Sequence, residues 1–231
     1  STSAARTAIS PCANPRARTG HLRTLLRSPC GREAAAAQDA EGSTALHLLC
    51  RNHAAIAEPA LSFKHSARYY DSNVTAVARL CEDLMARDYL ERFIQIGTSE
   101  LYGSTDRASR EDDPLKPTTP YAVSKAAADM HLDSLFNVLK FPMNIVRPSN
   151  AYAPGQLLYR IIPKTVVFGA TGRKLPLQGG GKARKSYLHA RDLAHALHLV
   201  IEKAPLGTTY NVGPPEPTSI RDLVIKTAQA M

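Results

Sequence analysis

The sequence of 231 residues lacks the hallmarks of several protein classes. Its four cysteines lie far apart and form no C-x-x-C pair, which disfavours a disulfide framework and a structural zinc site. No apolar run reaches the length of a membrane span, which argues against a membrane protein. The net charge of +9 is not gathered into one basic block, so nucleic-acid binding is disfavoured as well. An anionic small molecule is the partner class that this charge leaves open.

The N-terminal part of the chain is poor in acids and in strand-forming residues. Residues 1–32 contain no Asp or Glu and no Val precedes Val74, while three prolines would interrupt a helix there. An organelle transit peptide has this Arg-rich, acid-poor composition, but so does an extension without a stable fold. We favour the second reading and predict that residues 1–50 are a poorly structured or divergent extension. Scattered cysteines are typical of a reducing compartment, so we expect a cytoplasmic protein, with an organelle as the alternative.

Beyond residue 50 the apolar residues follow regular periods. Their spacing predicts helices over residues 69–87 and 120–139, and short buried runs predict strands at 93–96 and 144–147. Alternating helices and strands are typical of a parallel sheet with crossover helices, so we predict an α/β fold. The elements expected later in the chain are helices at 157–169, 192–201 and 219–231 and strands at 174–177 and 209–212.

Tyr121 and Lys125 form the strongest catalytic candidate. They lie four residues apart on a predicted helix, so their side chains share one face. The ordinary pKa of a tyrosine hydroxyl is about 10, and a neighbouring ammonium group lowers it. Such a tyrosine can take a proton from a sugar hydroxyl while a hydride leaves the same carbon. Thr98 follows the predicted strand at 93–96, where ligands of open α/β sheets bind, and its hydroxyl is a candidate to contact the same oxygen.

Six short segments together resemble one protein family, the extended short-chain dehydrogenase/reductases. These are the NAD-dependent nucleotide-sugar epimerases and dehydratases, and the resemblance covers about residues 60–231. The segments are 70–74 (YDSNV), 97–103 (GTSELYG), 120–125 (PYAVSK), 147–155 (RPSNAYAPG), 185–192 (KSYLHARD) and 209–213 (TYNVG). The resemblance implies a Rossmann-like parallel sheet, NAD or NADP as cofactor, a nucleotide-sugar substrate and a homodimer. It makes residues 51–147 a partial cofactor domain with the catalytic residues, and 148–231 a substrate-binding region.

The resemblance also implies roles for single residues. Tyr121 is the acid/base, and Lys125 is its electrostatic partner and a ligand of the nicotinamide ribose. Thr98 orients the sugar 4-hydroxyl, and Asn73 is the asparagine at a helix start on the cofactor side. The residues implied on the substrate side are Asn150, Arg184 and Lys185. Lys185 stands where the family has an arginine on the diphosphate, and a lysine lacks the bidentate fork.

Glu100 bears on the type of reaction. Its triplet Thr-Ser-Glu resembles that of GDP-mannose-type 4,6-dehydratases and UDP-glucuronate decarboxylases. A dehydratase needs a base for the C5 proton once C4 is a ketone, and a carboxylate two residues beyond Thr98 can serve. The alternative is a loop-capping or surface residue. We therefore predict a nucleotide-sugar 4,6-dehydratase or an epimerase.

A dinucleotide-binding glycine loop is not recognisable in the sequence. The family has G-x-x-G-x-x-G after a first strand, where backbone amides meet the cofactor pyrophosphate. Gly20, Gly31 and Gly42 are too far apart to form this pattern, and the usual last segment beyond Met231 is not seen either. We therefore expect a fragment, a divergent copy or a gene-model error, and weak NAD(P) binding by this chain. The alternative to an enzyme is a non-catalytic relative that keeps the fold.

Overall fold

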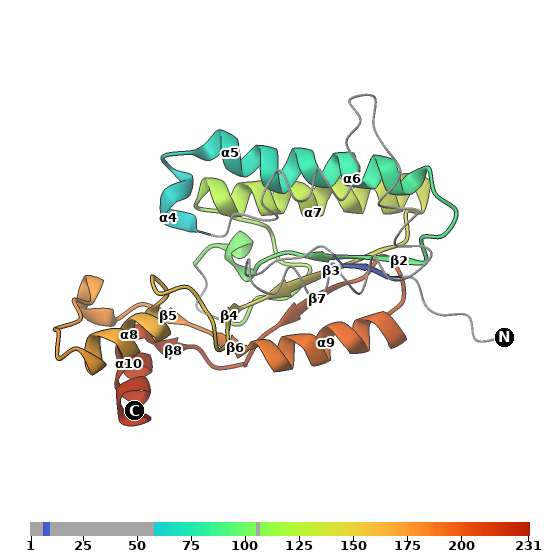
Figure 1. The fold of residues 1–231 in the computed structure, drawn as a ribbon. Coiled ribbons are helices and arrows are strands. Elements are labelled where there is room, and N and C mark those ends of the chain that lie inside the picture. Colours follow the sequence, from blue (N-terminus) through green and yellow to red (C-terminus); the bar gives the residue numbers. More distant parts are fainter. Residues whose placement is uncertain (1–6, 10–57, 105–106) are drawn as a thin grey trace.

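The computed structural model describes residues 7–9, 58–104 and 107–231, and a parallel sheet lies at its centre (Figure 1). Four strands form this sheet in the order β1-β2-β3-β7, and every neighbouring pair is parallel. The strands are β1 (Thr7–Ile9), β2 (Arg92–Ile96), β3 (Met143–Pro148) and β7 (Thr209–Val212). The α/β class predicted from the sequence is confirmed.

Helices cover both faces of the sheet. Three of them, α5 (Ser66–Tyr70), α6 (Ala76–Met85) and α7 (Pro120–Leu139), lie on one face. On the other face lies α9 (Ala190–Lys203), and a short helix, α4 (Pro59–Ser62), precedes α5 (Figure 1). Because both faces are covered, β3 is buried at every position.

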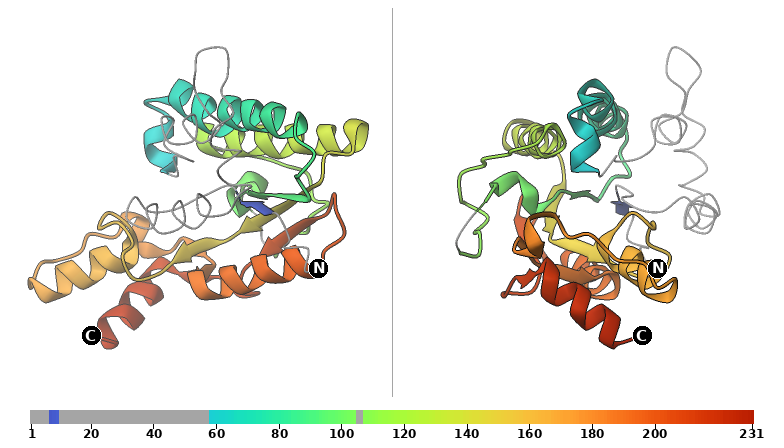
Figure 2. Two further views of the ribbon diagram at one scale, coloured as in Figure 1. Left: turned by 45° about the vertical axis from the view of Figure 1, so that its right-hand side comes forward. Right: turned by 90° about the vertical axis from the view of Figure 1, so that its left-hand side faces the viewer.

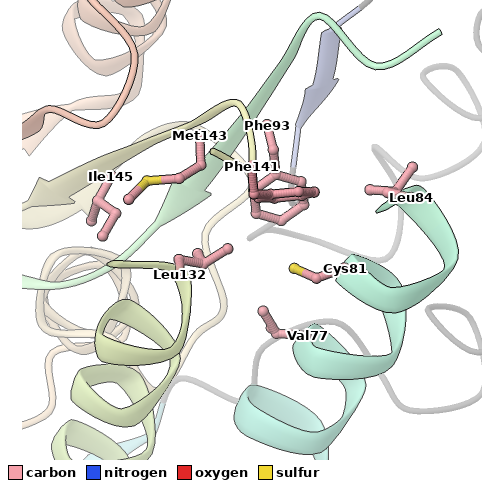
Figure 3. Close-up of a cluster of buried hydrophobic side chains, with 8 residues drawn as sticks. All are labelled: Val77, Cys81, Leu84, Phe93, Leu132, Phe141, Met143 and Ile145. Atoms are coloured by element: carbon pink, nitrogen blue, oxygen red, sulfur yellow. The ribbon is translucent and has the colours of Figure 1, made fainter. Parts of the chain in front are cut away.

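Alternating side chains of β2 and β3 build two separate cores. Phe93, Met143 and Ile145 point towards α6 and α7, where they meet Cys81 and Leu132 (Figure 3). The intervening residues belong to a second core on the α9 side, which contains Ile94, Ile96, Val146 and Val200. Because successive side chains of a strand point to opposite faces of the sheet, neighbouring residues of β2 and β3 pack into different cores.

Local sequence signals explain where the helices begin. Thr119 caps α7 by accepting a hydrogen bond from the backbone N–H of Ala122 at 3.1 Å. Pro120 occupies the first helical position, where the missing N–H has no partner to lose. The helix predicted at 69–87 is present but is interrupted by a π-helical turn, η1 (Asp71–Thr75), between α5 and α6. Such turns are frequently found at functional sites.

The C-terminal region has smaller and more exposed elements. Strand β4 (Asn150–Tyr152) pairs with β6 (Tyr187–His189), and β5 (Arg184–Lys185) pairs with β8 (Thr218–Ser219). Helix α8 (Ile161–Ala170) contacts α10 (Ile220–Gln229), and both lie beyond the carboxyl end of β3 (Figure 2). A short 3-10 turn, η3 (Gln178–Gly181), precedes β5.

Several sequence predictions need correction. The strand predicted at 174–177 is wrong, because that segment has no regular structure. Pro176 has no N–H to donate to a ladder. The helix predicted from 157 begins only at Ile161. Residues 1–50 were predicted to be a poorly structured or divergent extension. Within this range β1 pairs with β2, and the remaining residues lie outside the described part of the chain.

Across the residues described, we find no helix that is both long and apolar enough to cross a bilayer.

Candidate active site

The carboxyl end of β2 carries the first group of candidate residues. After Gly97, Thr98 caps a short 3-10 helix, η2 (Ser99–Tyr102), and its Oγ1 accepts a hydrogen bond from the Glu100 N–H at 3.2 Å. The Thr98 side chain is buried, and its hydroxyl keeps a proton to donate. The cap fixes Glu100 two residues beyond Thr98 in the first turn of η2.

Helix α7 brings Tyr121 and Lys125 to this strand end. Both are buried, with 8% and 2% of their surfaces exposed. Ile96 is the last residue of β2, and its carbonyl accepts a hydrogen bond from the Lys125 Nζ at 2.5 Å. The Tyr121 ring packs edge-on against Tyr69, with centroids 6.3 Å apart. The lysine ammonium therefore lies at the strand end that leads into Thr98, one helical turn from Tyr121.

Asn73 connects the π-helical turn to the catalytic helix. Its Nδ2 donates to the Ser124 Oγ at 2.9 Å, and that hydroxyl donates to the Tyr121 carbonyl at 2.7 Å. Asn73 is only 1% exposed. These contacts hold the first turn of α7 against η1, so Asn73 supports the backbone of Tyr121.

The substrate-side candidates are divided between two surfaces. The Lys185 Nζ lies 3.4 Å from the Glu100 Oε1, with both side chains partly exposed. The Arg184 guanidinium instead donates to the Pro217 carbonyl at 2.7 Å. Neighbours on a strand point to opposite faces, so β5 separates the two cations that the sequence grouped together.

Arg184 faces a cavity at the C-terminal region of the chain. An open cavity of about 370 Å³ is lined by Arg184, Pro217, Asp222 and Lys226 among others, and no catalytic candidate lines it. Asn150 donates from Nδ2 to the Ser186 carbonyl at 3.2 Å, beside Lys185. Of the substrate-side candidates, Lys185 is the one in contact with Glu100.

A buried polar network behind the site was missed by the sequence reasoning. Arg147, at the end of β3, donates from Nε to Asp129 on α7 at 2.9 Å and from Nη1 to the Tyr102 hydroxyl at 2.7 Å. The Tyr102 hydroxyl donates to the Asn211 Oδ1 at 2.9 Å. The segments around Tyr102, Arg147 and Asn211 carried the family resemblance, but nothing in their sequence showed that these side chains meet.

Burial dominates the electrostatics of this network. Desolvation raises the pKa of Asp129 above the ordinary carboxyl value, although the nearby Arg147 opposes the shift. Desolvation lowers the pKa of Arg147, but Asp129 and the Tyr102 hydroxyl raise it by more, so the guanidinium stays charged. A charged arginine therefore lies between α7 and η2, the two elements that carry Tyr121 and Glu100.

Known proteins with similar sequences and structures include nucleotide-sugar dehydratases. The dTDP-D-glucose 4,6-dehydratase of Mus musculus is 40% identical over 125 residues, which cover 54% of this chain and 35% of that protein. The structure of dTDP-glucose 4,6-dehydratase from Bacillus anthracis in complex with NAD is 32% identical, with a TM-score of 0.67. That match covers 71% of this chain and 53% of the other.

An epimerase shares the fold at lower identity. UDP-glucose 4-epimerase from Thermotoga maritima has a TM-score of 0.72 at 22% identity, covering 76% of this chain and 58% of the other. This chain thus spans little more than half the length of these solved structures. Residues 44–213 match the NAD dependent epimerase/dehydratase family, so the match begins before residue 60, where the sequence motifs became recognisable. The chain belongs to the NAD dependent epimerase/dehydratase family.

Proposed function

We propose that this chain carries the catalytic residues of an NAD(P)-dependent nucleotide-sugar 4,6-dehydratase. The observation that carries the proposal is the bond from Lys125 to the Ile96 carbonyl, which holds the Tyr121 helix at the strand end leading to Thr98 and Glu100. Dehydratases are also the relatives of higher identity, at 40% and 32%, compared with 22% for the epimerase.

The first step is oxidation at sugar C4. Tyr121 accepts the proton of the C4 hydroxyl, and the Lys125 ammonium stabilises the phenolate form that can do so. The Thr98 hydroxyl donates to the same sugar oxygen and orients it. The low exposure of these three side chains strengthens the electrostatic part of this assistance, because little water screens it.

The second step depends on a carboxylate. A plain sugar C5 has no stabilised anion, but a C4 ketone makes the C5 proton acidic enough for Glu100 to remove. The C6 hydroxyl then takes a proton from solvent, which balances the proton that Tyr121 removed from the C4 hydroxyl, and leaves as water. Glu100 returns a proton to C5 when the 4-keto-6-deoxy sugar forms. Lys185, at 3.4 Å from Glu100, is the cation that we assign to the substrate diphosphate, with Asn150 beside it.

The residues on the nicotinamide side fit a cofactor. Lys125 has three N–H donors and gives one to Ile96, so it retains donors for a ribose hydroxyl. Bound NAD(P) would accept the hydride from C4 and return it to C6. We assign Tyr121, Lys125 and Asn73 to the cofactor side of the site. Because the sequence contains no G-x-x-G-x-x-G, we expect weak retention of NAD(P), measured as cofactor absorbance after purification.

The test is turnover with defined sugars at saturating NAD or NADP. We expect dTDP-glucose or UDP-glucose to lose one water by mass spectrometry, and Tyr121→Phe to abolish that loss. Tyr70→Phe is the matched control, because Tyr70 is an exposed tyrosine on α5. Full activity of Tyr121→Phe, or no product from either sugar, would contradict the proposal. Inversion at C4 without loss of water would instead identify a 4-epimerase.

We also propose a homodimer that forms through the outer face of α7. Val123, Met130 and Val138 lie on that face and are 38%, 63% and 76% exposed. Their spacing of seven and eight residues forms an apolar stripe along the helix, and such a stripe favours a self-complementary contact. Met130→Lys should shift the mass measured by light scattering from dimer to monomer. A parental monomer would contradict the proposal.

A cytoplasmic location stays a prediction from the cysteine pattern. Microscopy of the tagged chain tests it against the organelle alternative.

A further inference from the structure

We propose that Tyr102 and Arg147 are positioning residues that fix Glu100 relative to Tyr121. The inference rests on the proposed function, because it concerns the placement of the C5 base against the C4 acid/base. The relevant feature is the buried network of Asp129, Arg147, Tyr102 and Asn211, which joins elements far apart in the chain.

Arg147 links the two elements that carry the two chemical steps. Asp129 lies on α7 one turn after Lys125, and the Arg147 Nε donates to it at 2.9 Å. Tyr102 is the last residue of η2, two residues after Glu100, and its hydroxyl accepts from the Arg147 Nη1 at 2.7 Å. One planar guanidinium therefore sets both the distance and the angle between α7 and η2.

Asn211 extends the network to β7 and to the loop that follows η2. Its Oδ1 accepts from the Tyr102 hydroxyl at 2.9 Å, and its Nδ2 donates to the Ser109 carbonyl at 2.9 Å. Its backbone N–H donates to the Glu111 Oε1 at 2.7 Å. The Tyr102 hydroxyl thus both accepts and donates, so η2 is held between β3 and β7.

Burial makes these bonds stiff. Asp129, Tyr102 and Arg147 are 0%, 3% and 4% exposed, so the short bonds of the charged pair act in a low dielectric. The backbone directly after β2 runs against them at Gly97. A Cβ added at Gly97 would lie 3.2 Å from the Arg147 Cγ and 3.2 Å from the Asp129 Oδ2. The network therefore also defines the path of the chain into Thr98.

The Tyr102 hydroxyl should affect the second chemical step, removal of the C5 proton, and not the first. Lys125 is anchored to Ile96 by a bond that does not involve Tyr102, so the oxidising group keeps its place when that hydroxyl is removed. The turn that carries Glu100 instead loses its bonds to β3 and β7. Removal of the C5 proton should therefore slow while oxidation at C4 continues. A displacement of about 1 Å is enough to cost about a hundredfold in rate.

Tyr102→Phe tests the inference, because it removes the hydroxyl and keeps the ring. Tyr70→Phe is the matched control: it deletes the hydroxyl of an exposed tyrosine on α5, outside the network. The readouts are single-turnover NADH absorbance with dTDP-glucose or UDP-glucose and hydrogen exchange of the backbone amides of residues 99–103.

For Tyr102→Phe we expect NADH to form at a rate within about threefold of the parental rate, and to decay at least about tenfold more slowly. Exchange at residues 99–103 should accelerate in Tyr102→Phe and not in Tyr70→Phe. Equal slowing of both steps, or unchanged decay and exchange, would overturn the inference. If the parental protein forms no NADH with either sugar, the proposed function fails, and unchanged exchange in Tyr102→Phe would overturn the positioning role independently.

Discussion

The sheet with its covering helices and the C-terminal region are packed in different ways. Helix α7 buries eight residues, among them Tyr121 and Lys125, whereas α10 has no buried residue and α8 has one. Tyr121 and Lys125, which we propose to act in oxidation of the sugar, thus belong to a well-buried helix. Lys185 and Arg184 instead lie on an exposed strand of two residues. Regions with few buried contacts open most easily. We therefore expect a rigid chemical centre beside a more adaptable binding surface.

The largest expected effect comes from the core of the sheet region. Phe93→Ala should lower the free energy of unfolding by about 3–5 kcal/mol, because Phe93 is fully buried between the sheet and α6 and α7. In the C-terminal region, Ile225→Ala should change it by less than about 0.5 kcal/mol, because Ile225 is 45% exposed. Urea denaturation followed by circular dichroism measures both.

Equal losses of stability in these two variants would contradict the difference in packing between the two regions. They would mean that the C-terminal region contributes as much to the cooperative core as the sheet does.

The buried ion pair tests the same comparison through charge. Arg147→Met should cost about 3–5 kcal/mol of unfolding free energy, because it leaves the buried Asp129 without its cation. The double variant Arg147→Met with Asp129→Leu should regain most of that loss, since no charge is left buried. The measurement is again denaturation by urea. A double variant no more stable than the single one would show that the pair contributes more than charge compensation.

Sequence periodicity predicted the sheet region well because burial there is regular. Helix 120–139, strand 93–96 and strand 209–212 all match the structure within one residue. The C-terminal strands escaped prediction because two or three residues show no period. The predicted strand at 174–177 failed for a related reason: its apolar residues lie in a segment without a neighbouring strand.

The candidate site was predictable only in part. Tyr121 and Lys125 could be paired from a spacing of four on one helix. The opposite directions of Arg184 and Lys185 depend on β5 forming at all, which sequence did not indicate. The contact of Asp129, Arg147 and Tyr102 depends on register across the sheet, and side chains from three elements cannot be brought together by local pattern alone.

The two cations of β5 should differ in their effect on nucleotide affinity. Lys185→Gln should weaken UDP or dTDP binding at least tenfold, because one charged hydrogen bond is worth about 1.5–3 kcal/mol. Arg184→Gln should change it by less than about threefold, since its guanidinium is bonded to Pro217. Isothermal titration calorimetry measures both. A larger effect for Arg184 would assign the nucleotide to the cavity beside α10.

A further prediction concerns the reactivity of the Cys81 thiol, which lies in the core. Burial, with a smaller contribution from Glu82, raises the pKa of its thiol from 9.0 to about 12. At pH 8 the thiolate is therefore rare, and Cys81 should resist Ellman's reagent until the protein unfolds. Since its pKa is higher in the folded state, any stability that it contributes is lost as pH rises from 9 towards 12. Fast labelling of native protein with Cys12, Cys30 and Cys50 replaced by Ser would contradict the packing described.

The most direct test of the dehydratase proposal is single-turnover kinetics of Glu100→Gln with dTDP-glucose or UDP-glucose at saturating NAD. The substitution keeps the shape of the side chain and removes the base. We expect NADH to form at close to the parental rate, and the 4-keto-6-deoxy product to form about tenfold to thousandfold more slowly. Formation of that product at the parental rate would contradict the assignment of Glu100 as the C5 base, and with it the dehydratase mechanism.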